Sequence, residues 1–495
     1  MMHLILTVAQ MREADRIAIE RGTAGIVLME RAGAAVAERA REGFPAAREI
    51  LVLCGPGNNG GDGFVAARLL AAAGVRVRVA LLGSREALAG DAATAAGGWT
   101  GEVLDAAAVQ PARGELVVDA LFGTGLGRDL DGAARDLVER VNRAHCPVMA
   151  VDIPSGIDGD TGRVCGVAIR ADATVTFAAR KPGHLLFPGR SHCGRIDVAD
   201  IGIADDVVEA VAPAFSANEP ELWIESFPVP DLDTHKYARG HAMVLSGDAS
   251  HTGAARLVAR GALRMGAGAV TLVSPRAALA VNAAHLTAIM LAVCDDPEEL
   301  AALLSDKRIT AVALGPGLGV GERTRALVKA AAKAGRGLVL DADALTSFAG
   351  EAYTLGAIST SARECVWTPH HGEMQRLFEA AEGVMDAPSK LETTLRAATV
   401  ARSVVIYKGG DTVVAAPDGR AAIAANASPY LATAGSGDVL AGFVAGLLAQ
   451  GMPAFEAACA AVWLHGEAGM RLGPGLIAED LPEVAPGVLA RLLSP

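Results

Sequence analysis

The sequence lacks paired cysteines, an excess of basic residues and a long uninterrupted apolar run. Its seven cysteines are scattered along 495 residues without a C-x-x-C pair, which argues against a zinc site or disulfide framework and indicates reduced core thiols in a cytosolic protein. Acidic residues outnumber basic ones by 56 to 44, for a net charge of −12. This balance disfavours nonspecific binding to nucleic acid or to anionic membranes.

Targeting and membrane-spanning signals are also missing. Residues 1–16 contain a short apolar stretch but lack a basic region and a cleavage pattern. The most hydrophobic region, 439–464, is interrupted by Gln450-Gly451-Met452-Pro453 and carries Glu456, so it predicts two buried helices. We therefore expect a cytoplasmic protein with no membrane or nucleic-acid partner.

The length and composition indicate two globular domains. A chain of 495 residues is too long for one ordinary core, and 51% of it is hydrophobic. Between residues 204 and 230 the pattern loosens into acids, prolines and isolated aromatics, which predicts a boundary near residue 220. The expected domains are therefore residues 1–220 and 221–495.

The N-terminal half begins with two expected helices, the first capped by Thr7 and the second starting at Leu28. After them, strand and helix patterns alternate. Such alternation predicts a Rossmann-like, doubly wound α/β domain with a mostly parallel sheet. The expected helices lie near 63–73, 86–97 and 132–144, and the expected strands are 50–54, 75–82, 116–122, 148–153 and 174–177.

Glycine and polar residues gather where these strands end. The segment 55–63, GPGNNGGDG, matches the GxGxxG pattern of dinucleotide-binding dehydrogenases. Two features weaken that interpretation: the next strand ends without an acid for the ribose hydroxyls, and Asp62 would repel a pyrophosphate. The oxygen-rich side chains of this segment better suit a hydroxylated ligand or a cation.

Two further acids end buried strands in this half. Asp119 precedes the glycine-rich segment 123–129, and Asp152 precedes Pro154-Ser155-Gly156. Because ligands of parallel sheets bind beyond the carboxyl ends of the strands, we expect both acids to be functional.

The segments GPGNNGGDG, VDALFGTGLGRD and VDIPSG together resemble the NAD(P)H-hydrate epimerase family. The resemblance implies potassium contacts at Asn59, Asp119 and Ser155, and a proton-transfer role at the hydrated C6 carbon for Asp152. It also implies that the hydrated dinucleotide contacts Asp152 and two segments, namely Asn58, Asn59, Gly60, Gly61 and Asp62, and Gly123, Thr124, Gly125, Leu126, Gly127, Arg128 and Asp129.

A second alternating series fills the C-terminal half and predicts another α/β domain. Helices are expected at 252–265, 321–334 and 389–402, with a hairpin turn at 417–419. The expected strands lie near 242–246, 269–273, 288–293, 310–314, 337–341 and 404–407.

The most informative stretch of the chain is Thr433–Gly442, in which Gly435-Ser436-Gly437-Asp438 leads into an apolar helix. The backbone N–H groups of Gly435, Ser436 and Gly437 would lie at the helix N-terminus, where the helix dipole favours a phosphoryl group. Asp438 would accept a proton from a substrate hydroxyl, as a kinase aspartate does. A plain helix cap with glycines in a tight turn is the alternative. The chain has no GxxxxGK[ST] pattern, which argues against a P-loop nucleotidase.

The ordered set DADAL, TPHHGE, KGGDT and ATAGSGDVLAG resembles the NAD(P)H-hydrate dehydratase family, a branch of the ribokinase-like superfamily. Ser428 and Ala434 depart from the family pattern, in which many relatives have asparagine and glycine. The resemblance implies that Ala255, Gly317, His370 and Asp438 contact the hydrated dinucleotide. The adenine nucleotide would contact Gly435, Ser436 and Gly437, and also Lys408, Gly409, Gly410, Asp411 and Thr412.

The two resemblances, in this order, imply a bifunctional repair enzyme with ADP, or alternatively ATP, as phosphoryl donor, with K⁺ and Mg²⁺ as cofactors. The N-terminal half would interconvert the R and S hydrates of NADH or NADPH, and the C-terminal half would dehydrate the S form. We also expect a homo-oligomer. The alternative is a ribokinase-like kinase of a small molecule or vitamin precursor, with a noncatalytic dinucleotide-sensing first domain.

Overall fold

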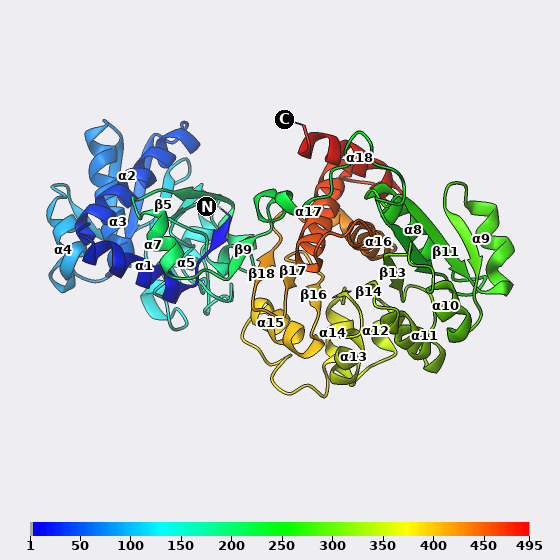
Figure 1. The fold of residues 1–495 in the computed structure, drawn as a ribbon. Helices are drawn as coiled ribbons and strands as arrows, with labels where there is room; N and C mark the ends of the chain where they lie inside the picture. Colours follow the sequence, from blue (N-terminus) through cyan, green and yellow to red (C-terminus); the bar gives the residue numbers. More distant parts are fainter. Residues whose placement is uncertain (1–2, 495) are drawn as a thin grey trace. The chain divides into compact units, whose positions relative to one another are not determined.

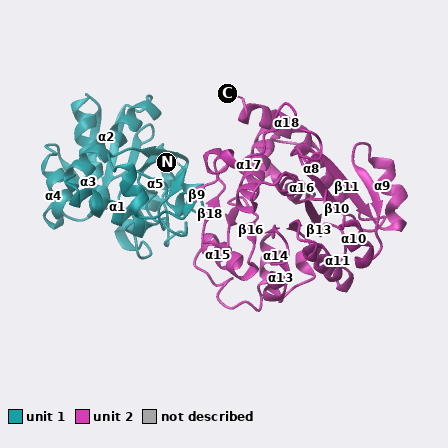
Figure 2. Ribbon diagram, in the orientation of Figure 1, with its two compact units in different colours: residues 1–215 teal, residues 216–495 magenta. Residues whose placement is uncertain are grey.

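The alternation of apolar strands and amphipathic helices produces two α/β units, as predicted. The computed structural model describes residues 3–494, and the chain divides between Phe215 and Ser216 (Figure 2). Each unit has its own sheet and its own core. Within the described residues no helix is both long and apolar enough to cross a membrane.

Unit 1 is built on a parallel sheet with the strand order β4-β3-β2-β5-β6-β7-β8. The order changes direction between β2 and β5, so ligands are expected beyond the carboxyl ends of these two strands. The strands are β1 (Leu4–Ile5), which lies outside this sheet, β2 (Glu49–Cys54), β3 (Arg76–Leu81), β4 (Val103–Asp105), β5 (Leu116–Ala120), β6 (Val148–Val151), β7 (Ala173–Phe177) and β8 (Arg195–Ala199).

Helices cover both faces of the unit 1 sheet, because residues on opposite faces of its strands enter two separate cores. One face packs against α1 (Val8–Glu20), α2 (Gly25–Gly43), α3 (Asn58–Ala72) and α4 (Gly90–Gly97), and the other against α5 (Gly132–Arg143). Thr7 caps α1 as predicted, with its hydroxyl accepting the Gln10 N–H at 3.1 Å. Two short helices follow, α6 (Arg190–Cys193) and α7 (Asp205–Ala210).

Helix α3 begins earlier than the sequence indicated. We expected a loop over 55–63, yet the helix starts at Asn58 and includes three of its glycines. A Cβ atom on Gly60 would lie 1.9 Å from the Gly55 carbonyl oxygen, and one on Gly63 would lie 2.7 Å from the Ala120 Cβ. The close approach of helix to strand requires glycine here, and this packing outweighs the poor helix propensity of glycine.

Unit 2 contains a longer sheet whose order from one edge is β18-β17-β16-β15-β14-β13-β10-β11-β12, with β9 beside β18. Pairing is parallel from β16 to β12 and antiparallel among β16, β17 and β18, where the predicted hairpin lies. The strands are β9 (Phe215–Ala217), β10 (His241–Leu245), β11 (Ala269–Ser274), β12 (Met290–Val293), β13 (Ala311–Leu314), β14 (Gly337–Leu340), β15 (Glu364–Trp367), β16 (Val404–Tyr407), β17 (Val413–Ala415) and β18 (Ala421–Ile423).

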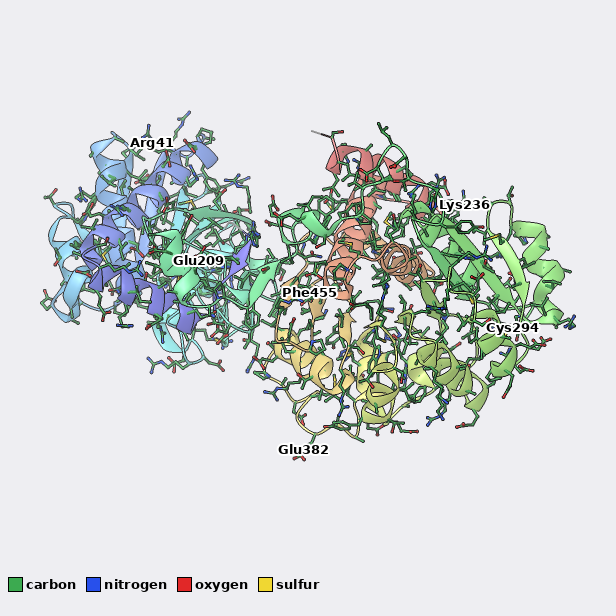
Figure 3. The ribbon with its side chains drawn as sticks, in the orientation of Figure 1. Arg41, Glu209, Lys236, Cys294, Glu382 and Phe455 are labelled. Carbon is green, nitrogen blue, oxygen red and sulfur yellow. The ribbon has the colours of Figure 1, made fainter. Side chains whose placement is uncertain are left out.

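One face of this sheet forms a large core with α8 (Gly253–Arg264), α16 (Ser436–Ala449), α17 (Ala454–Leu472) and α18 (Asp480–Leu492) (Figure 1). Helix α16 approaches α8 closely, since a Cβ on Gly442 would lie 2.3 Å from the Val258 carbonyl oxygen. Figure 3 labels Phe455 of α17, which is 3% exposed and lies beneath the Arg420 guanidinium.

The other helices of unit 2 complete the second layer. Trp367 at the end of β15 contacts Phe378 after α14 and donates a hydrogen bond to Ser359 of α13, so these helices cover the opposite face. The remaining bounds are α9 (Leu279–His285), α10 (Pro297–Leu303), α11 (Glu322–Lys333), α12 (Asp343–Thr346), α13 (Ala352–Ser359), α14 (His371–Leu377) and α15 (Lys390–Ala401).

Candidate active sites

A cavity of about 730 Å³ lies in unit 1 where β2 and β5 end. This volume is typical of a small-molecule site. The predicted contacts that line it are Asn58, Asn59, Asp62, Gly123, Thr124, Gly125, Leu126, Gly127, Arg128 and Asp152. The predicted contacts Gly60, Gly61 and Asp129 are not among its lining residues. Gly61 serves packing, because a Cβ there would lie 2.6 Å from the Met29 sulfur.

Asp152 is held in an unusual conformation directly after β6. Its φ of 64° is in the left-handed region that non-glycine residues rarely adopt. One carboxylate oxygen accepts hydrogen bonds from Lys181 Nζ at 2.8 Å and from Thr176 Oγ1 at 3.1 Å, and the other accepts the Thr124 N–H at 3.1 Å. Backbone strain that the surroundings maintain in this way is typical of functional sites.

Lys181 fixes the charge of this carboxylate. Its side chain is only 1% exposed and pairs with Asp152. Burial raises the pKa of Asp152, but the charge and hydrogen bond of Lys181 outweigh burial and hold the pKa below its ordinary value. Asp152 is therefore an ionised acceptor at neutral pH. The sequence analysis did not identify Lys181; the available signal was a lysine just after a buried strand.

Asp119 ends β5 in a cluster of oxygen atoms. Its carboxylate accepts the Ser155 N–H at 2.8 Å and the Ser155 hydroxyl at 2.6 Å. Burial raises the pKa of Asp119 to about 6, against the lowering effect of the bonds from Ser155. No lysine, arginine or histidine within the described residues forms an ion pair with it.

Asn59 extends this cluster toward the cavity. The Asn59 side-chain NH2 group donates to the Val151 carbonyl at 3.2 Å, and its amide oxygen accepts the Gly123 N–H at 3.3 Å. The predicted ligands Asn59, Asp119 and Ser155 thus present oxygens and one full negative charge. Such a set fits a large monovalent cation.

In unit 2 the strand order changes direction between β10 and β13, and a cavity of about 440 Å³ lies beside the loops after them. Gly317 lines this cavity with φ of 73°, and a Cβ on Gly247 would lie 1.8 Å from the Gly317 carbonyl oxygen. The acidic and basic side chains of the lining are Asp248, Asp295, Arg323 and Asp343, and His251 lies among them. Of the residues predicted to bind substrate in this unit, only Gly317 lines the cavity.

The start of α16 has the geometry that the sequence predicted. Gly435 is the N-cap residue with φ of 86°, and Ser436, Gly437 and Asp438 form the first turn. The first N–H groups of a helix have no partner within it, so they point outward as donors for an anion. The buried His465 contacts the Ser436 hydroxyl at 3.1 Å, and burial lowers the pKa of His465 to about 4, which keeps its ring neutral.

Asp438 belongs to a group of carboxylates around one lysine. Lys408 Nζ pairs with Asp341 at 2.9 Å and would lie 3.3 Å from a Cβ on Gly437. Burial and the charge of Asp341 raise the pKa of Asp438 to about 7, although Lys408 opposes the shift. Burial likewise raises the pKa of Glu373. A carboxylate with a pKa near neutrality is suited to act as a general base.

The predicted nucleotide-binding residues 408–412 form a compact loop after β16. Gly409 N–H donates to the Thr412 hydroxyl at 3.0 Å, and that hydroxyl donates back to the Gly409 carbonyl at 2.7 Å. Lys390 of α15, which sequence reasoning missed, pairs with Asp411 at 2.7 Å. Gly410 lies within the same loop.

His370 and Ala255 differ in what they offer a ligand. His370 caps α14 by accepting the Glu373 N–H at 3.2 Å, while its side chain is 53% exposed. Ala255, in the first turn of α8, is completely buried, backbone included, so it exposes no atom to a ligand in this structure.

Comparisons with known families agree with this division. A family model described as the YjeF-related protein N-terminus matches residues 25–183, and one described as NAD(P)H-hydrate dehydratase matches residues 242–480. A solved structure of the ADP/ATP-dependent NAD(P)H-hydrate dehydratase from Bacillus subtilis, co-crystallised with ATP and Mg²⁺, is 25% identical. It covers 56% of this chain and 98% of its own, with a TM-score of 0.47.

Full-length relatives match both units together. The bifunctional NAD(P)H-hydrate repair enzyme Nnr of Salinibacter ruber is 37% identical over 98% of this chain and 96% of its own length. The enzyme of the same name from Moorella thermoacetica is 38% identical over 99% of this chain and 97% of its own length. The chain belongs to the family of bifunctional NAD(P)H-hydrate repair enzymes.

Proposed function

We propose that this enzyme repairs hydrated NADH and NADPH, with the epimerase site in residues 1–220 and the dehydratase site in residues 221–495. The observation that carries the proposal is Asp438, a carboxylate with a pKa of about 7 in the first turn of α16. It combines a proton acceptor poised near neutrality with the N–H groups of a helix N-terminus, which suit a phosphoryl group.

In the dehydratase reaction Asp438 takes the proton of the C6 hydroxyl of the S hydrate. The hydroxyl oxygen attacks the terminal phosphorus of the nucleotide, a P–O bond forms, and the shorter nucleotide leaves with the bridging oxygen. The N–H groups of residues 435–437 and the Lys408 ammonium offset the charge of the moving phosphoryl group. The phosphate then departs from C6 and a proton leaves C5, which restores the ring double bond. Phosphorylation serves this elimination because phosphate leaves far more readily than hydroxide.

We propose ADP as the donor, with ATP as the alternative, and Mg²⁺ bound with the nucleotide. Asp341, Glu373 and Asp438 outnumber the single positive charge of Lys408, although within the described residues they form no cluster of three metal ligands by themselves. Mg²⁺ is usually held by one or two carboxylates together with substrate phosphates. When bound, it would neutralise charge on the transferred phosphoryl group; Asp341 and Glu373 are the carboxylates that would hold it.

In the epimerase site we propose that Asp152 accepts a proton from the hydroxyl or water at C6 while the loops 58–62 and 123–129 bind the dinucleotide. We propose that Asn59, Asp119 and Ser155 hold K⁺, whose positive charge would stabilise the loops around the substrate. The buried Asp119 carboxylate, which has no cationic side chain paired with it within the described residues, supports this assignment.

The proposal also includes the identity of the phosphoryl donor, the cellular location of the enzyme and its oligomeric state. Activity with ADP and with ATP, each at equal concentration, distinguishes the donors by kcat/KM. Cell fractionation tests a cytoplasmic location, and light scattering of the purified chain tests a homo-oligomer.

A single assay tests the repair reaction. The full chain is given S hydrate, R hydrate or both, with and without nucleotide, and the reduced nicotinamide and released phosphate are measured. We expect one phosphate per dinucleotide restored, and use of the R hydrate only through conversion to S. Asp152→Ala should retain S-hydrate repair and lose R-hydrate use; equal use of both epimers by this variant contradicts the role of Asp152. A stable phosphorylated product would instead support the small-molecule kinase.

A further inference from the structure

Three carboxylates line the unit 1 cavity, namely Asp15, Asp62 and Asp152, and their partners differ. Asp152 has Lys181, Thr176 and the Thr124 N–H as partners. Asp15 of α1 and Asp62 of α3 line the same cavity. Within residues 3–494 neither of these two side chains takes part in a hydrogen bond or an ion pair.

A structural role does not explain these two acids. A partly buried carboxylate without a partner is costly, because nothing in the protein replaces the water it has lost. The helices themselves do not need them, since α1 is capped by Thr7, and the close packing of α3 depends on its glycines. Both positions are therefore explained by something that occupies the cavity.

The electrostatics of Asp15, Asp62 and Asp152 favour one proton that stays bound to these carboxylates. Burial raises the pKa of Asp15 to about 6, with the charge of Lys181 opposing and that of Asp152 adding to the shift. Burial, Asp152 and Asp15 raise the pKa of Asp62 well above its ordinary value. Since Lys181 compensates Asp152, the other two acids cannot both ionise easily. The acidic and basic side chains around this cavity are Arg12, Asp15, Asp62, Asp91, Arg128, Asp152 and Lys181.

We propose that Asp15 and Asp62 share one proton and are the catalytic acid for interconversion of the R and S hydrates. This inference rests on the epimerase function proposed for unit 1. It adds Asp15, which lies outside every glycine-rich loop, to the catalytic group and separates the acid from the ionised Asp152.

The chemistry balances as a loss and return of water. The shared proton moves to the C6 hydroxyl, the C6–O bond breaks with its electron pair on oxygen, and the N1 lone pair forms a C6=N1 iminium. Water then adds to the opposite face of this planar carbon. The added water gives its surplus proton to Asp152, and transfer onward to the Asp15–Asp62 pair restores the starting state, because Lys181 favours ionised Asp152.

The test measures R/S interconversion by the full chain without nucleotide, starting from pure S hydrate and separating the epimers by chromatography. The variants are Asp15→Asn, Asp62→Asn and the double substitution, and Glu13→Gln is the matched control because Glu13 is an exposed acid on the same helix. Hydrogen–deuterium exchange of β2 and β5 in the same preparations shows whether unit 1 remains folded.

We expect the double variant to lose about 10²- to 10⁴-fold in interconversion, the usual contribution of a general acid, while Glu13→Gln retains the full rate. In each single variant the remaining acid loses the repulsion of its neighbour, so its pKa falls. The decline of the rate at high pH should then begin at lower pH than in the unmodified chain, which a merely structural role would not cause.

A double variant that keeps interconversion within about threefold overturns the proposal, and so do single variants with an unmoved decline at high pH. If the unmodified chain does not interconvert the epimers above the uncatalysed rate, the proposed epimerase function itself fails, which is a separate result.

Discussion

Replacing Lys181 with methionine tests the charge balance of the epimerase site most directly. The substitution removes a side chain that is 1% exposed and leaves the Asp152 carboxylate, itself only 14% exposed, without its cation. It also removes the hydrogen bond from Lys181 Nζ to Thr176 at 2.8 Å. Loss of one member of a buried ion pair typically costs about 3–5 kcal/mol.

The pH dependence of this loss follows from the pKa of Asp152. In the unmodified chain the pKa of the folded state lies below the ordinary value, so the ion pair contributes stability that is present above that value and lost as the pH falls through the folded pKa. In Lys181→Met, burial without the lysine raises the pKa instead. The destabilisation should therefore be greatest at high pH and should shrink as the pH falls and Asp152 becomes protonated.

Hydrogen–deuterium exchange with mass spectrometry measures the effect within the full chain. Peptides from β2 and β5 report the opening of unit 1 alone, and about 3–5 kcal/mol corresponds to exchange faster by about two to four orders of magnitude. Peptides from β13 and β14 of unit 2 are the internal control.

A double variant, Lys181→Met with Asp152→Asn, separates the ion pair from lost packing. With both charges removed, most of the stability should return, because the cost comes from the unpaired buried carboxylate. Two results for Lys181→Met would refute this reasoning. One is hydrogen exchange in β2 and β5 that rises by less than about tenfold, and the other is a loss of stability that grows as the pH falls.

Three other outcomes follow from the structure. Asp438→Asn should lower nucleotide-dependent dehydration by about 10²- to 10⁴-fold and spare R/S interconversion. In the unmodified chain the dehydration rate should rise with pH through about 7, because Asp438 ionises there. A dehydration rate that does not change with pH would contradict the role of Asp438 as the base. Gly435→Ala places a Cβ 2.7 Å from Leu257 Cδ1 at a φ of 86°, so it should cost about 1–2 kcal/mol and weaken nucleotide binding measured by calorimetry; unchanged affinity would contradict the anion site. Asp119→Asn should abolish any difference between K⁺ and Na⁺ in epimerase assays, and a persisting difference would move the cation elsewhere.

The strand-ending acids were predictable because their signal is local. A buried apolar run followed by an acid and glycines, as at Asp119 and Asp152, places polar groups at the carboxyl edge of a parallel sheet, and both acids lie there. The first turn of α16 was predictable for the same reason. Strands β4 and β8 were missed because they are the edges of the unit 1 sheet, are partly exposed, and carry too little apolar sequence to stand out.

The partners of these acids were not predictable, because they come from distant parts of the chain. Lys181 lies 29 residues after Asp152, and Lys408 lies 67 residues after Asp341. Nothing in the local sequence distinguishes such a lysine from a solvated one. Asp15 was not predictable for a different reason. A single acid in an amphipathic helix is expected on the exposed face of that helix, but in α1 this residue lines the cavity.

The two proposed catalytic aspartates show that direct pairing with a lysine decides protonation more than the types of residue present. Asp152 and Asp438 both lie near a lysine, yet the pKa of Asp152 is lowered and that of Asp438 is raised to about 7. Lys181 forms its only ion pair within the described residues with Asp152, whereas Lys408 pairs with Asp341 and also faces Glu373 and Asp438. Lys181 therefore donates a hydrogen bond directly to Asp152 in unit 1, whereas in unit 2 Lys408 bonds to Asp341 and acts on Asp438 only through its charge. The first arrangement keeps Asp152 ionised as a proton acceptor, and the second leaves a carboxylate able to gain and lose a proton at neutral pH, as phosphoryl transfer from a hydroxyl requires.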